Sequence, residues 1–171
     1  MKPITFFLLL IFAAPSCQDT DSLSSIDPVN WDKRKADLSG MDSLQSGRTY
    51  LSVYSEIYSQ DEHQTHDLTA TISMRNTSTS DTIYVLKAEY FDTKGQSIRT
   101  YFNQPIFLAP LETVEIVIDE LDRSGGSGAN FIFDWQKEKQ TYEPIFEAVM
   151  ISTYGQQGIS FVTQGKTIAT E

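Results

Sequence analysis

The sequence predicts an all-β fold, a single antiparallel β-sandwich of immunoglobulin-like outline in residues 48–171. From Thr49 onward, apolar and polar side chains alternate with a period of two, the period of a half-buried strand. Turn-forming residues separate the alternating segments at short intervals, and no long helical pattern interrupts them. A small closed β-barrel built from the same strands is the alternative.

The first three expected strands occupy residues 50–58, 68–75 and 82–92. The second strand has one apolar face, which consists of Leu68, Ala70, Ile72 and Met74. The third strand is rich in β-branched and aromatic residues, which favour strands. Its expected apolar side consists of Tyr84, Leu86, Ala88 and Tyr90.

A hairpin turn with Gly95 at a positive φ is expected to lead into a strand at residues 97–107, and Pro110 breaks the chain after it. Four further strands are expected at residues 113–118, 131–135, 145–153 and 158–163. The first two of these four have clear apolar faces, formed by Val114, Ile116 and Ile118 and by Phe131, Phe133 and Trp135.

Residues 1–16 have the layout of a secretory signal peptide: a positive Lys2, an apolar stretch, and small residues at Ala14 and Ser16. The apolar stretch is too short for a permanent membrane-spanning helix, which needs about 20 residues. Small residues directly before Cys17 resemble the lipobox of bacterial lipoproteins, a resemblance that implies lipid attachment at Cys17. Ala14 and Ser16 also suit an ordinary signal peptidase, which would release a soluble protein.

The segment 17–47 is polar and has no sustained periodicity, which is typical of a flexible tether. We therefore expect an exported, membrane-anchored protein of the cell envelope, facing the periplasm or the cell surface. The formal net charge of −10 argues against nucleic acid as a partner, because binding phosphates requires clustered Lys and Arg. The chain has one cysteine, so it has no internal disulfide. Nothing in the sequence indicates a cofactor.

A glycine-rich loop is the candidate binding site, formed by Gly125, Gly126, Ser127, Gly128, Ala129 and Asn130. It resembles the nucleophile elbow of a hydrolase, but an apolar strand follows it and no histidine lies after Ser127. Its N–H groups suit an anion-binding nest. The structural interpretation is a strand connection that uses positive φ at the glycines and a cap at Asn130.

Other polar residues have weaker patterns. His63 and His66 suggest a metal site, but their ligand set is incomplete, so we expect solvated loop residues and no metal. The carboxylates at the end of the strand 113–118, those of Asp119, Glu120 and Asp122, are expected to be exposed. Glu147 lies in an apolar strand and is expected to face solvent or to pair with Arg75 or Arg99.

Several segments together resemble an uncharacterised bacterial family, the domain-of-unknown-function family 3124. They are residues 76–77, 90–95, 108–113, 125–131 and 144–150, and the string Gly-Gly-Ser-Gly-Ala-Asn-Phe is the most specific. The resemblance implies an exported domain, often of lipoprotein type, and brings no activity or site residues with it. We therefore expect a non-catalytic envelope module that binds a partner or has a structural role. The alternatives are a small hydrolase with its site at the loop 125–130 and a metal-dependent binding protein.

Overall fold

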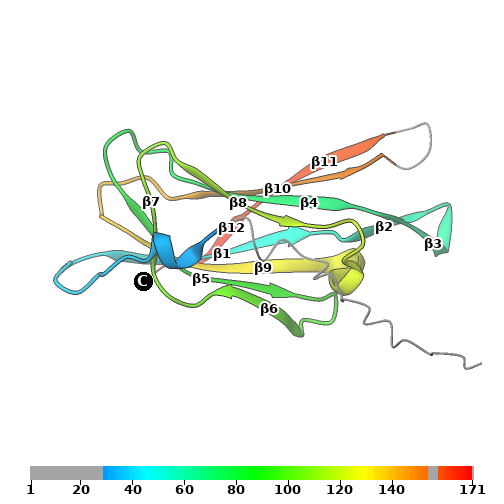
Figure 1. Ribbon diagram of the computed structural model, residues 1–171, viewed down its shortest axis with the longest axis horizontal. Coiled ribbons are helices and arrows are strands. Elements are labelled where there is room, and N and C mark those ends of the chain that lie inside the picture. The colour runs from blue at the N-terminus through cyan, green and yellow to red at the C-terminus, as the bar shows by residue number, and fades with distance from the viewer. Residues whose placement is uncertain (1–28, 154–157, 171) are drawn as a thin grey trace, which may run out of the picture.

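The computed structural model describes residues 29–153 and 158–170 of the 171-residue chain. Two antiparallel sheets face each other, and Figure 1 shows them edge-on. The six-stranded sheet has the order β12 (Lys166–Thr170), β1 (Gln45–Val53), β9 (Ala129–Lys137), β5 (Ile83–Phe91) and β6 (Ser97–Phe102), with β7 (Ile106–Leu108) also paired to β5. The four-stranded sheet has the order β11 (Ile159–Gln164), β10 (Ile145–Ser152), β4 (Thr69–Arg75) and β8 (Thr113–Ile118).

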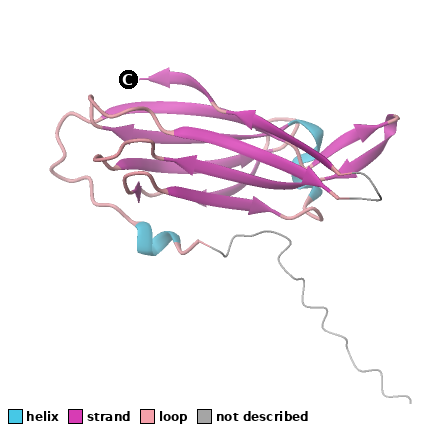
Figure 2. Ribbon diagram, turned by 90° about the horizontal axis from the view of Figure 1, so that it is seen from above, coloured by secondary structure: helices cyan, strands magenta, loops and turns pink. Residues whose placement is uncertain are grey.

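These sheets confirm the all-β sandwich, and they do not close on each other as a barrel would. A separate hairpin of β2 (Glu56–Ser59) and β3 (Asp61–Asp67) projects from one end of the sandwich (Figures 1 and 2). Two short 3-10 helices complete the described residues, η1 (Trp31–Arg34) and η2 (Arg123–Gly128). Neither of these helices is long and apolar enough to cross a membrane.

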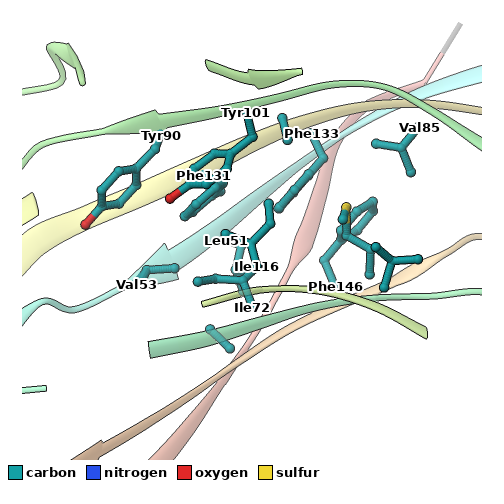
Figure 3. Packing of buried hydrophobic residues seen from close by; sticks show 14 of the residues in the cluster. Leu51, Val53, Ile72, Val85, Tyr90, Tyr101, Ile116, Phe131, Phe133 and Phe146 are labelled. Atoms are coloured by element: carbon teal, nitrogen blue, oxygen red, sulfur yellow. The ribbon is translucent and has the colours of Figure 1, made fainter. Parts of the chain in front are cut away.

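The core lies between the two sheets and is formed by the alternating apolar faces that the sequence predicts. The expected faces of β4, β8 and β9 are all buried. Aromatic rings run through this core (Figure 3), because Phe131 stacks on Tyr90 at 4.8 Å and on Phe133 at 5.4 Å between ring centres. Phe133 in turn stacks at 4.3 Å on Phe146, which belongs to the opposite sheet. The rings therefore join the two layers.

The prediction of which side chains of residues 82–92 are buried is wrong for the first half of the segment. Ile83 and Val85 are buried there, while Tyr84 and Leu86 are only half-buried. The pairing of β5 with β9 shifts between Val85 and Lys87, so one extra residue enters β5. Such a bulge reverses the inward face, and the buried set continues as Ala88 and Tyr90, as expected.

The division of the chain into strands also differs from the prediction. The segment 50–58 is divided between β1 and β2 by a turn at Ser55, and the segment 97–107 between β6 and β7. Strands β3 and β12 were not expected; the histidines expected in a loop lie in β3. Gly95 has the positive φ that the hairpin turn requires, 76°.

Part of the expected tether packs on the sandwich. Cys17 and the leader lie outside the described residues, but residues 29–47 are described. The Trp31 ring lies 4.7 Å from that of Phe102, and Arg34 forms an ion pair of 2.8 Å with Glu112. The Ala36 N–H donates to the Pro105 carbonyl, and β1 already begins at Gln45. The half-buried Trp31 and Arg34 thus tie this segment to the strands around β7, which its polar composition did not indicate.

Candidate functional site

The glycine-rich loop lies at the end of the sandwich where β8 leads into β9, and it forms η2 (yellow coil in Figure 1). Asp122 caps this helix: its carboxylate accepts hydrogen bonds from the Ser124 N–H at 3.2 Å and from the Ser124 hydroxyl. Asn130, the expected cap, instead lies in β9. The cap residue therefore precedes the glycines rather than following them.

Gly125 is buried because the loop folds directly onto Tyr90. A Cβ atom at this position would overlap the Tyr90 hydroxyl oxygen and also approach the Ser55 hydroxyl to 2.8 Å. These two hydroxyls lie 2.8 Å apart and share a hydrogen bond. The Ser55 N–H also donates to the Gly126 carbonyl at 3.1 Å. Gly125 is thus required for space, since only a residue without a side chain allows this approach.

Thr93 holds the loop from the other side. Its N–H and its hydroxyl both donate to the Gly125 carbonyl, at 3.1 and 3.0 Å. The Gly128 N–H donates to the same hydroxyl oxygen at 3.0 Å. Among the loop glycines only Gly126 has a positive φ, 70°. Several polar backbone atoms of the loop are therefore occupied by bonds within the protein.

A partly buried ion pair holds Asp122, the residue that caps η2. Both terminal nitrogens of Arg99 donate to Asp122 Oδ2 at 3.1 Å, and one of them also donates to the Tyr101 hydroxyl at 3.1 Å. Asp122 is 6% exposed, so the expectation that it is an exposed strand end is wrong. Burial raises the pKa of Tyr90 to about 12, although its hydrogen bond with Ser55 opposes the shift. Tyr90 is therefore a neutral hydrogen-bonding group at physiological pH.

Residues 46–168 match a family model described as a protein of unknown function (DUF3124). The chain belongs to this family. The family match includes the whole loop 125–130 and its supports Ser55, Tyr90 and Thr93, whereas Cys17 and η1 lie outside it. No curated protein and no solved structure matches the chain significantly.

The candidate loop residues do not share one environment. Gly125 and Ala129 are buried, while the others are half-buried. Within the described residues, neither the Ser127 hydroxyl nor the Asn130 side chain has a hydrogen-bonding partner, so these two polar loop side chains remain for contact with another molecule.

The histidines lie apart from the loop glycines, on the projecting hairpin. The His63 side chain is 81% exposed, 3.6 Å from Glu62. His66 lines an open hollow of about 490 Å³ together with Asp67, Arg123 and Glu120. Arg123 and Asp67 form an ion pair at 2.5 Å across it. In the described residues, no group of three or more His, Cys, Asp or Glu side chains is arranged to hold a metal ion.

Glu147 has the partner that the sequence suggested, because Arg75 Nε donates to its carboxylate at 3.0 Å. Arg99, the other expected partner, pairs with Asp122 instead. Sequence analysis missed the supports of the loop, Ser55, Tyr90 and Thr93. The cap at Asp122 had a local signal, an Asp two residues before a Ser at a helix start. The other three had none, since each is distant from the loop along the chain.

Proposed function

We propose that this chain is a non-catalytic module of the cell envelope, anchored by lipid at Cys17, whose sandwich binds a partner or has a structural role. The observation that carries the proposal is that backbone groups of the loop 125–130 are used in contacts within the protein. The Tyr90 hydroxyl occupies the space that a side chain at Gly125 would need, and the Gly128 N–H donates to Thr93. A hydrolase site would need such N–H groups directed at an oxyanion. This geometry favours a structural role for the loop over a catalytic one.

The anchor is tested by fractionation. Cys17→Ser should move the protein from the membrane fraction to a soluble or unprocessed form, because it removes the sulfur that would carry the lipid. Wild-type protein that already stays soluble after a high-salt wash would contradict the anchor. Cys17 is the chain's single cysteine, so no other thiol can substitute for it.

The role of the loop is tested by comparing Ser127→Ala with Gly125→Ala. Gly125→Ala should cost about 1–3 kcal/mol, because its methyl group overlaps the Tyr90 hydroxyl. Ser127→Ala should change the unfolding free energy by no more than about 0.5 kcal/mol, since its hydroxyl has no partner among the described residues. Urea unfolding measures both values. A stable Ser127→Ala protein that loses the phenotype of the wild-type gene in a deletion strain would show that the loop is a working site.

A further inference from the structure

Three distant segments of the chain form the hollow that His66 lines. They are the projecting hairpin, the turn that leads into η2, and the end of β10. Figure 1 shows all three at the same end of the sandwich. Arg123 of η2 donates to Asp67 of β3, and the Ser55 N–H, at the base of the hairpin, donates to the Gly126 carbonyl of η2. The fold therefore sets the shape of the hollow in advance, which lowers the cost of binding a ligand there.

Ser152, at the end of β10, is a buried polar residue in the wall of this hollow. It is 5% exposed, and its hydroxyl has no hydrogen-bonding partner among the described residues. Its neighbours on the inward face of β10, Ala148 and Met150, are apolar. A buried hydroxyl usually has a partner, because leaving it unpaired costs free energy. Ser152 therefore offers an unused hydrogen bond to a molecule in the hollow.

The charges that line the hollow disfavour a charged ligand. An anion would meet the carboxylates of Asp67 and Glu120, in a protein whose net charge is −10. An organic cation would compete with Arg123, which is already paired with Asp67. In the part of the chain that the structure describes, the carboxylates and His66 are not grouped to hold a metal ion. A neutral ligand avoids each of these conflicts.

The uncharged groups of the hollow suit a ligand that carries several hydroxyls. The side chains of Ser59, Thr65, Ser152 and Gln64 can each donate and accept hydrogen bonds. Leu121 is 60% exposed and adds an apolar surface. A sugar ring combines hydroxyls, which also donate and accept, with a face of C–H groups that can cover such a surface. The volume of about 490 Å³ lies in the range of small-molecule sites.

We propose that this hollow binds a neutral saccharide. The Ser152 hydroxyl and the Gln64 amide exchange hydrogen bonds with the hydroxyls of the sugar, and the C–H face of the ring lies on Leu121. Glu120, whose carboxylate has no partner among the described residues, accepts from a further hydroxyl. The inference rests on the binding role proposed above and names the class of partner. It does not depend on the anchor at Cys17.

The test is an array of neutral, acidic and basic disaccharides and trisaccharides, probed with the full-length protein in mild detergent. Wild type should bind neutral saccharides. Ser152→Ala should weaken binding of the strongest of them about tenfold, the effect of one lost hydrogen bond. The matched control is Ser160→Ala, which makes the same change at an exposed position of β11 away from the hollow and should leave the affinity intact.

Absence of binding to the neutral saccharides would overturn the proposal, as would equal affinities for wild type and Ser152→Ala. Binding confined to basic saccharides would also overturn it and would make the hollow a cation site. Glu120→Gln checks this point, because it keeps an acceptor oxygen but removes the charge: binding of a neutral sugar should persist, and binding of a cation should fall.

The Ser152→Ala protein must melt within a few degrees of wild type. If it does not, Gln64→Ala replaces it, because Gln64 is exposed and its truncation leaves the core intact. Membrane fractionation of Cys17→Ser reads the proposed anchor separately, so failure of either idea is distinguishable from failure of the other.

Discussion

At the scale of single residues, Tyr90 connects the loop to the core. Its ring stacks on Phe131, while its hydroxyl bonds Ser55 and occupies the space that Gly125 leaves empty. The Tyr90 side chain therefore explains why residue 125 is glycine, and it also bonds the residue at which β1 and β2 are separated. Such a buried hydroxyl stabilises the fold only while it is neutral.

Tyr90 should make the protein sensitive to high pH. Its pKa is about 12 in the folded chain and near the ordinary value of 10 in the unfolded chain. The stability from the neutral phenol is complete below pH 10 and is lost as the pH rises from 10 to 12. Two pKa units correspond to about 3 kcal/mol. Tyr90→Phe should flatten this decline, as measured by urea unfolding across that range.

The matched control for Tyr90→Phe is Tyr58→Phe, because the Tyr58 side chain is 62% exposed on the projecting hairpin. It should leave the alkaline decline unchanged. If the unfolding free energies of wild type and Tyr90→Phe fell equally steeply with pH, Tyr90 would not be the cause of the alkaline decline. At neutral pH, Tyr90→Phe should itself cost about 1–3 kcal/mol, because the buried Ser55 hydroxyl loses its partner.

At the scale of elements, the short helix η1 is attached to the sandwich by a few specific contacts. Trp31 packs on Phe102, and Arg34 lies over the Phe107 ring while it pairs with Glu112. A four-residue helix is not stable alone, so these contacts hold it. The ion pair with Arg34 lowers the pKa of Glu112. The attachment therefore weakens in acid, as the pH falls through the folded pKa of that carboxyl group.

Trp31→Ala should destabilise the protein by about 1–3 kcal/mol, since it removes the ring from a half-buried contact. Trp31→Phe should retain the stability of wild type or exceed it slightly. The reason is that the Trp31 Nε1 is buried and has no hydrogen-bonding partner among the described residues, whereas phenylalanine has no such polar group. The stability of both variants is measured as the midpoint of urea unfolding, provided that the dependence of the unfolding free energy on urea concentration is unchanged. A Trp31→Ala protein as stable as wild type would show that residues 29–44 act as a free tether.

At the scale of the whole molecule, the two outer surfaces of the sandwich differ in chemistry. The six-stranded sheet presents the ion pairs Arg48–Asp134 and Lys87–Glu89. The four-stranded sheet presents, in register across its strands, a row of Val162, Val149, Thr71 and Val117. The ion pair Arg75–Glu147 and the exposed Glu115 lie on the same sheet. Both outer surfaces therefore carry charged side chains, and the four-stranded sheet differs by its mostly apolar row.

The sequence by itself determined the fold class and most of the buried faces. Alternation with a period of two is a local signal, because the alternate residues of a strand lie on one face of the sheet and that face is buried. It also determined the turn at Gly95. For Glu147 it left solvent, Arg75 and Arg99 open, and the structure selects Arg75. The tertiary structure decided what depends on residues far apart in the chain: the bulge in β5, the attachment of η1, and the contact of Gly125 with Tyr90. Each of these arises from packing between distant segments, and no local pattern records which segment will supply the neighbour.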